Sequence, residues 1–528
     1  MITLPTDCLY QIFQHFKDDL KTLHSCLLSN RTCCELIIPI LWSNPWKLIP
    51  KKKSTPENRI SLISLLSTIL SCLPSESKQL LHDKHVQWKS HKIFLNYITY
   101  CRSLDFHGIW DMLDVVSAQD PQFFSVSNFK THIKNLVGQE ICKMIILQST
   151  KITQMIISEM SYLFYNLFRD LSLNDSQSLS HLNDFEYEIN EDSNLLTFNN
   201  LSNVCKNISN FTIYLRIAPN ESFNDLIKSQ NSIKFMNINF KYDPSSKFIN
   251  SLLLHANTLT HLYVSCNRES TFSKIFSVHH TFSNLRFLKY HVYSDFDDFD
   301  DDDDDDDDGD DDYNENSQSM KMVNLSLPNL EILELDGQTP FSYYIIAQII
   351  QGTQGKLERL YMSYSIYYTN LILNQSILRS CQNLKVLTTF VTKDTLIIIL
   401  EILTSCRNLE GIALYSRTNE IYSILNHLSL HPLKNLYNLK FNIIDSCWNF
   451  STKNLKLFLK SLEKEELVKK INISLIYKQI DIYPNDIYLN KIIDLFETYY
   501  LKGIIASYFI EDENDVIYEY DDWQRLLI

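Results

Sequence analysis

The chain has 528 residues, of which 45% are hydrophobic, and a formal net charge of −15 at pH 7. This length exceeds what one compact hydrophobic core usually organises, so we expect several domains or a repeat array. The net charge lies in one segment, because residues 295–312 contain 15 aspartates and the remainder is formally neutral. The sequence therefore shows no basic face, and we do not expect nucleic acid as a partner.

Other features of composition exclude several classes of site. The 12 cysteines include no CxxC pair and no cluster with histidine at zinc spacing, and the 8 glycines form no phosphate-binding loop. No basic and apolar signal segment opens the sequence, and apolar runs such as 395–405 fall short of the roughly 20 residues that a membrane span needs. We expect free thiols, no metal, no cofactor and no membrane partner, in a protein of the cytoplasm or the nucleus. No Walker, GxSxG or HExxH motif occurs, so the chain is predicted not to be an enzyme and no catalytic residue is predicted.

Residues 1–46 are predicted to form a small all-helical module. Leu9, Ile12 and Phe16 recur at helical spacing and predict one apolar helical face. A later helix of the module is predicted to end before Pro39. So small a module has more large apolar residues than it can bury, which is typical of a surface that binds a partner. Alternatively, the same residues pack on the helices that follow.

The order of residues in this module resembles an F-box. The resemblance rests on Leu4-Pro5, Asp7, Leu9, Ile12-Phe13, Phe16, Leu27-Leu28-Ser29-Asn30-Arg31, Cys34 and Trp42. Leu28 stands where valine is common in the family, and Cys34 stands where tryptophan is common. The family implies docking onto the adaptor protein Skp1 and, through it, onto a cullin–RING ubiquitin ligase. By position, the implied Skp1 contacts are Leu4, Pro5, Leu9, Ile12, Leu27, Leu28 and Trp42.

Residues 47–100 are predicted to be a helical linker and an irregular cap. An apolar helix is expected over residues 57–73 and a polar loop over residues 75–90. Residues 101–206 are predicted to hold two or three degenerate repeats, with a helix over residues 137–165.

A phrase with apolar residues at matched positions recurs through residues 207–484. It begins at Asn207, Ser232, Thr258, Asn284, Asn329, Lys356, Asn383, Asn408 and Asn435. The gaps are 25 to 27 residues, except for one of 45 that contains the aspartates. Each phrase is predicted to be a short strand followed by an amphipathic helix, and a period of this length indicates a solenoid. Cys205, Cys381 and Cys406 each lie two residues before a phrase, where a small apolar residue suits a turn.

These units resemble leucine-rich repeats of the cysteine-containing subtype, which commonly follow an F-box. The resemblance implies an α/β fold, a right-handed solenoid with a curved parallel sheet on its concave side. Such surfaces bind proteins in most members of the family. Solvent-facing strand positions would include Lys385, Glu410 and Tyr437.

The acidic segment and the end of the chain are predicted separately. Residues 295–318 are expected to be a disordered loop that interrupts the repeats, because like charges repel and no apolar face exists. The loop is either a tolerated solvated insertion or an acidic patch that attracts basic protein segments or divalent cations. Residues 485–528 are predicted to form a C-terminal cap.

Two functions are compatible with this organisation. In the first, the chain is the substrate-recognition adaptor of an SCF-type (Skp1–cullin–F-box) E3 ubiquitin ligase, and the repeats bind an unidentified protein substrate. In the second, it is a leucine-rich-repeat interaction scaffold without a ligase role, and residues 1–46 only cap the solenoid. A cap would bury Leu9, Ile12 and Leu28 against the following helices, whereas a docking module would expose them. A hydrolase within residues 107–200 has no motif to support it.

Overall fold

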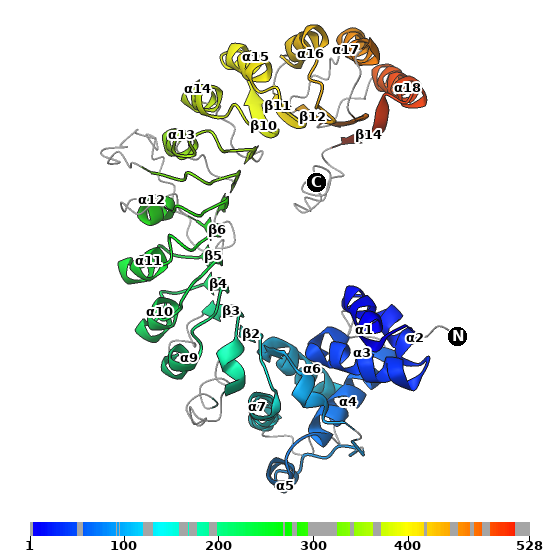
Figure 1. Cartoon of the computed structure of the whole chain (residues 1–528), viewed down its shortest axis with the longest axis vertical. Coiled ribbons are helices and arrows are strands. Elements are labelled where there is room, and N and C mark those ends of the chain that lie inside the picture. Colours follow the sequence, from blue (N-terminus) through cyan, green and yellow to red (C-terminus); the bar gives the residue numbers. More distant parts are fainter. Residues whose placement is uncertain are drawn as a thin grey trace, which may run out of the picture. The chain divides into compact units, whose positions relative to one another are not determined.

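Parallel strands alternate with helices along most of the described chain (Figure 1), and several of the strands alternate buried and half-buried residues. The computed structural model describes residues 4–49, 56–90, 92–93, 95–119, 130–157, 167, 177–189, 198–267, 270–276, 282–293, 325–337, 343–362, 371–416, 420–443, 452–464, 469–477 and 486–512. The chain divides into two units, Met1–His255 and Ala256–Ile528. Parallel strands require crossover connections, and helices supply most of them here.

The first unit begins with helices and continues with alternating strands and helices. Its helices are α1 (Thr6–His15), α2 (Leu20–Leu27), α3 (Arg31–Ser43), α4 (Pro56–Ser71), α5 (Ser75–Asp83), α6 (Phe106–Gln119), α7 (Lys130–Gln148), α9 (Asn199–Val204), α10 (Glu221–Lys228) and α11 (Ser246–Leu253). Its 3-10 helices are η1 (Pro45–Leu48), η2 (Tyr97–Tyr100) and η4 (Gln177–His181). Its strands are β1 (Ser103–Asp105), β2 (Gln154–Ile157), β3 (Asp184–Ile189), β4 (Asn210–Leu215) and β5 (Phe235–Phe240). They pair in chain order, and every pair is parallel.

The second unit continues the alternation of strands and helices. Its strands are β6 (His261–Cys266), β7 (Phe287–Val292), β8 (Ile332–Gly337), β9 (Arg359–Met362), β10 (Val386–Val391), β11 (Gly411–Ser416), β12 (Asn438–Ile443), β13 (Ile471–Tyr477) and β14 (Ile505–Asp512). Its helices are α12 (Ser270–Phe276), α13 (Tyr343–Gly352), α14 (Leu371–Ser380), α15 (Leu396–Ser405), α16 (Ile421–Leu430), α17 (Thr452–Lys464) and α18 (Asp486–Leu501). Helices α14 to α18 follow the outer side of an arc and the strands follow its inner side (Figure 1). The predicted α/β class with parallel strands is confirmed.

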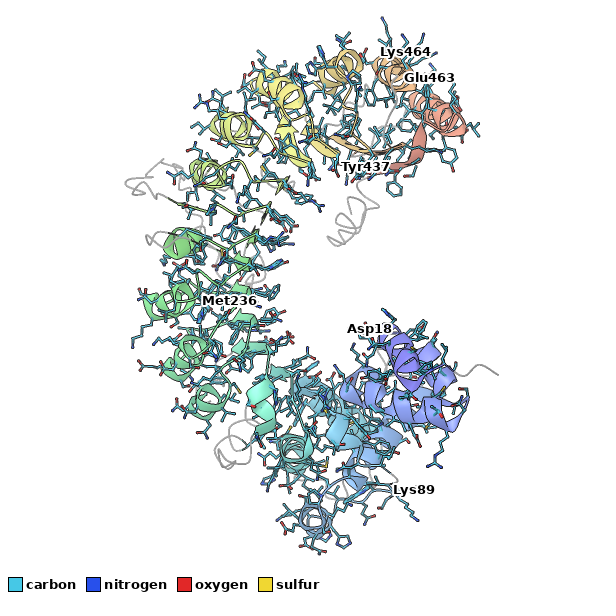
Figure 2. All side chains as sticks on the ribbon, viewed as in Figure 1. Asp18, Lys89, Met236, Tyr437, Glu463 and Lys464 are labelled. Atoms are coloured by element: carbon cyan, nitrogen blue, oxygen red, sulfur yellow. The ribbon has the colours of Figure 1, made fainter. Side chains whose placement is uncertain are left out.

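The recurring phrase supplies the core of both units. Each of the nine phrases starts its strand three residues after its first residue. The second residues of the phrases are Ile208, Ile233, Leu259, Leu285, Leu330, Leu357, Leu384, Leu409 and Leu436. The fifth residues are Phe211, Met236, Leu262, Leu288, Leu333, Leu360, Leu387, Ile412 and Leu439. All of them are at most 2% exposed, and Met236 lies between the strands and helices of the first unit (Figure 2).

In-register pairing stacks these buried residues into ladders. Leu288 stands opposite Leu333, which in turn stands opposite Leu360. A single strand and helix cannot enclose their own apolar side, so each repeat completes its core with its neighbours. The spacing of the phrase therefore predicts both where a strand starts and which residues face the helices.

Buried cysteines lie at the turns that lead into several strands. The Cys205 thiol donates to the carbonyl oxygen of Leu179 (3.3 Å), and the Cys406 thiol donates to that of Cys381 (3.2 Å). Each bond reaches back to the preceding repeat. Burial raises the pKa of the Cys205 and Cys381 thiols to about 12 and that of Cys406 to about 11. These cysteines are core residues that stay protonated at neutral pH.

Two predictions near the start of the chain are wrong. Helix α3 does not end before Pro39, which lies inside it. Proline removes one helical hydrogen bond, but Ile37 and Ile40 on either side of it are buried in a core shared with Phe13 and Leu23. This packing holds the helix together.

The predicted loop over residues 75–90 contains helix α5. The sequence of this helix is mostly polar, which suggested a loop. Leu81 is nevertheless fully buried, while Leu80 beside it is 38% exposed. The apolar helix predicted over residues 57–73 is confirmed by α4.

Strands β2 and β3 reveal two repeats within residues 107–200 that the sequence left without a register. Their phrases begin at Lys151 and His181, three residues before each strand. The buried positions of these phrases are Ile152, Met155, Leu182 and Phe185. Both phrases thus follow the same rule as the regular ones.

The helix predicted over residues 137–165 is confirmed to Gln148 and wrong over residues 149–157, which contain strand β2, while residues 158–165 lie outside the described residues. The predicted cap at residues 485–528 contains helix α18 and then β14, a further strand parallel to β13. The acidic segment 295–318 lies outside the described residues.

Removing one ladder residue should weaken the second unit. We expect Leu384→Ala to lower the free energy of unfolding by about 2–5 kcal/mol, because Leu384 is fully buried and its loss leaves a cavity. Ile397→Ala, at a residue of α15 that is 69% exposed, should change it by less than about 0.5 kcal/mol. Urea unfolding followed by circular dichroism measures both values. Equal losses in the two variants would show that the ladder is not the source of stability.

The buried thiols should resist modification in the folded chain. At pH 8, Ellman's reagent should label the exposed Cys8 quickly and Cys205, Cys381 and Cys406 only after denaturation. Because burial raises the pKa of the Cys205 and Cys381 thiols above the ordinary thiol pKa of 9.0, their burial stabilises the fold below pH 9, and this contribution declines as the pH rises from there toward about 12. Peptide mapping of the labelled sites checks the order. Early labelling of Cys406 would contradict it.

Candidate partner-binding site

The module of residues 4–48 is held together by a small core between three helices. Helix α3 packs against both α1 and α2, and Phe13, Leu23 and Ile37 are buried where they meet. The Asn30 side chain caps α3 by accepting a hydrogen bond from the backbone N–H of Cys33 (2.8 Å). The module is thus a defined structural element with its own core.

One side of this module covers the free edge of strand β1. The backbone N–H of Arg102 donates to the carbonyl oxygen of Ser43 (2.8 Å). The buried Trp46 donates from Nε1 to the carbonyl oxygen of Ser103 (2.8 Å). An uncovered edge strand exposes unpaired backbone groups, so these bonds close the start of the sheet.

Trp42 also belongs to this closing side. Its ring stacks on Tyr97, with centroids 4.7 Å apart and planes at 20°. The residue is half-buried. Trp42, one of the predicted Skp1 contacts, therefore already has an intramolecular partner.

Other predicted contact residues are exposed. Leu4 is 54% exposed, Ile12 41% and Leu28 70%, and Phe16, which directly follows the helix of Ile12, is 39% exposed. Pro5 is exposed as well. Large apolar side chains left in solvent on so small a module make this side a candidate for association.

Leu9 and Leu27 differ from these residues. Both are half-buried and pack against the core of the module itself. The structure thus sorts the seven predicted contacts into exposed residues, core-supporting residues and the stacked Trp42. A cap would bury Ile12 and Leu28 against the following helices, and the structure leaves them in solvent.

The open faces of the sheets are a second candidate surface. In the second unit, the residues predicted at solvent-facing strand positions each lie one residue before the strand, so the strand assignment is wrong for them. They are half-buried and paired with neighbouring repeats. Lys385 forms an ion pair with Glu358 (Nζ–Oε2, 2.7 Å), and the Tyr437 hydroxyl donates to Glu410 (2.9 Å). Tyr437 lies on the strand side of the second unit, whereas Glu463 lies on its helix side (Figure 2).

Lys469 extends this row, because its Nζ lies 4.0 Å from the centre of the Tyr437 ring. Burial raises the pKa of the Tyr437 hydroxyl, and its hydrogen bond to Glu410 adds to the effect. Arg286 and Glu331 pair in the same way at the corresponding positions of earlier repeats (2.7 Å). These pairings were not predicted from the sequence. Residues of opposite charge at the same position of neighbouring phrases could have indicated them.

The described residues hold no arrangement that indicates catalysis. Ser265, His291 and Asp336 share one register row on β6, β7 and β8. His291 Nε2 lies 3.7 Å from Asp336 Oδ2, and the structure gives no hydrogen bond between Ser265 and His291. Without that bond nothing activates the serine as a nucleophile.

The described ranges contain neither a candidate metal site nor a candidate membrane-spanning helix. No group of three histidine, cysteine, aspartate or glutamate side chains in those ranges could hold a metal ion. None of the helices there is both long enough and apolar enough to cross a membrane.

Comparison with known proteins adds no relative. No model of a protein family matches the chain, and no curated protein shows significant similarity to it. The arrangement of side chains therefore carries the functional argument.

Loss of the Trp46 hydrogen bond should loosen the start of the sheet. We expect Trp46→Phe to destabilise the first unit by about 1–3 kcal/mol, because the buried carbonyl of Ser103 loses its donor. Trp42→Phe keeps an aromatic ring beside Tyr97 and should cost less. Hydrogen exchange of residues 101–106, read by mass spectrometry, reports on the edge directly. Unchanged protection in Trp46→Phe would contradict a closing role.

Proposed function

We propose that this chain is the substrate-recognition adaptor of an SCF-type E3 ubiquitin ligase, with residues 1–46 binding Skp1 and the repeats binding a protein substrate. The observation that carries the proposal is the exposure of Leu4, Ile12 and Leu28 on a module whose other side closes the sheet. Fully burying an exposed side chain of this size contributes about 1.5–3 kcal/mol. Leu4, Ile12 and Leu28 are between 41% and 70% exposed, so covering each of them contributes part of that value, and together they favour docking. The order of F-box-like residues in the sequence supports the choice of Skp1.

The adaptor role requires no chemistry from the chain. Holding a substrate beside a charged ubiquitin-transfer enzyme raises its effective concentration and sets its orientation. We further propose that the strand–helix units are leucine-rich repeats of the cysteine-containing subtype in a right-handed solenoid. The constant offset between phrase and strand, and the buried cysteines at the turns, support this assignment.

A scaffold without a ligase role is the second candidate. The bonds from Trp46 and Arg102 that close the β1 edge favour it, since closure alone would justify the presence of the module. It leaves the exposed Ile12 and Leu28 without a purpose, and for that reason it ranks second.

Co-precipitation with Skp1 separates the two functions. The wild-type chain should capture Skp1, and Ile12→Asp and Leu28→Asp should each reduce capture at least about tenfold, which corresponds to about 1.4 kcal/mol. Both residues are exposed, so neither variant should unfold the module. Leu430→Asp, at a residue 68% exposed on α16, is the matched control and should capture Skp1 normally. If the wild type fails to capture Skp1, or Leu28→Asp captures it equally well, the adaptor function is refuted.

A further inference from the structure

The open face of strand β3 in the first unit is acidic. Its sequence, Asp184-Phe-Glu-Tyr-Glu-Ile189, alternates acidic and apolar residues. Phe185 and Tyr187 are buried on the helix side. Asp184, Glu186 and Glu188 consequently share the opposite face, because strand side chains alternate. Three like charges on one face of a strand repel one another.

The three carboxylates differ in their partners. Asp184 accepts a hydrogen bond from Asn210 Nδ2 (2.5 Å), and Glu188 forms an ion pair with Arg216 (2.8 Å). Within the described part of the chain, no cation or hydrogen-bond donor contacts Glu186. Glu186 is half-buried, so its charge is partly removed from water, and His107 is the nearby group whose positive charge opposes the resulting rise in its pKa.

A second carboxylate lies in the same row. Register places Asp105 of β1 opposite Ile156 of β2, and Ile156 opposite Glu186 of β3. One oxygen of Asp105 accepts from the backbone N–H of Gly108 (2.9 Å) at the start of α6. The half-buried Ile156 thus forms an apolar floor between two half-buried acidic side chains.

The electrostatics of this row favour a cation. Burial raises the pKa of Glu186, and the negative charges of Asp105 and Glu188 raise it further. Burial likewise raises the pKa of Asp105, while its hydrogen bond to Gly108 and the nearby His107 oppose the rise. A positive group placed between Asp105 and Glu186 would compensate both carboxylates at once.

The surroundings of the row are also suited to a basic side chain. Tyr214 stands opposite Glu188 on the neighbouring strand and is 37% exposed. An exposed aromatic ring can hold a cation over its face. The cationic groups at the margin are Arg216, which is paired with Glu188, and His107, which lies 3.3 Å from Asp111.

We propose that the open face of β1 to β4 binds a basic segment of a protein partner. A lysine or arginine side chain of that segment lies with its charged end between Asp105 and Glu186. Its alkyl chain covers Ile156, as long basic side chains do on apolar surfaces. Tyr214 contacts a neighbouring part of the same segment. The inference rests on the proposed function in one respect, since it takes this partner to be the substrate protein.

The spacing of the carboxylates favours a basic side chain over a metal ion. Asp105 and Glu186 lie on strands separated by β2, and neighbouring strands are about 4.8 Å apart. A calcium ion needs six to eight oxygen ligands at 2.3–2.6 Å, which two carboxylates across an isoleucine do not supply. A branched or extended cationic side chain spans such a gap with several donors.

Peptide binding to the full chain tests the proposal. Because the aspartates of residues 295–312 would also attract basic peptides, the tests use a background in which residues 300–308 are asparagine. The probe is a fluorescein-labelled peptide of alternating lysine, arginine and glycine, measured by anisotropy. We expect Glu186→Gln to weaken binding about tenfold and Glu186→Lys to abolish it. Glu401→Gln, on the exposed face of α15, is the matched control and should bind as the background does.

Three outcomes would overturn the proposal. They are equal binding by the Glu186→Gln variant and the background, equal binding of an oligoglutamate peptide, and self-association of the chain that Glu186→Lys abolishes. The test is independent of the adaptor function, because peptide binding requires no Skp1. Loss of Skp1 capture with intact peptide binding would refute only the adaptor, whereas the reverse result would refute only the basic-segment site.

Discussion

The structure depends on one constraint: a strand with its helix cannot bury its own apolar side. Every second and fifth residue of the phrase is covered by the repeats beside it, so no repeat is stable alone. The cysteine thiols reinforce the dependence, because each hydrogen bond reaches back to the preceding turn. The repeat at each end of such an array has a neighbouring repeat on one side only, so its other side must be covered in another way.

At the start of the array the helical module supplies that solution, and this decides which of its residues remain available. Trp46 and Ser43 are engaged in closing β1, and Trp42 is stacked on Tyr97. The large apolar residues left in solvent include Leu4, Ile12, Phe16 and Leu28, which lie on or next to α1 and α2. A small module with two apolar sides is understandable if each side has its own partner, one within the chain and one outside it.

The sequence predicts the core better than the surface, for physical reasons. Burial restricts the second and fifth residues of each phrase to large apolar side chains, so the ladder is visible in the letters alone. The phrase at His181 lies 26 residues before Asn207, at the regular gap, so the sequence could have indicated it. The phrase at Lys151 is harder to find, because it lies 30 residues before His181 and two helices, α6 and α7, precede it. The predicted helix end at Pro39 is wrong because tertiary packing outweighs the low helix propensity of proline at this position.

The sequence does not show which of the predicted contact residues of the module are exposed and which support its core. Leu9, which supports the core, and Ile12, which faces solvent, lie on one helix and have equal apolar character. Their difference arises from where α3 crosses α1, and helix spacing alone does not encode that crossing.

The net charge of the chain likewise does not show where charged side chains come together in the fold. Outside the aspartate segment the chain is formally neutral, so the net charge indicates no general acidic surface. Register nevertheless brings Asp105 and Glu186 into one row although 81 positions separate them in the numbering. Open-face residues are free of the packing that fixes the ladder, so the fold tolerates the mutual repulsion of Asp184, Glu186 and Glu188 as a small cost against a large buried core. A repeat fold can therefore concentrate charge locally while its total stays near zero, and recognition depends on the local value.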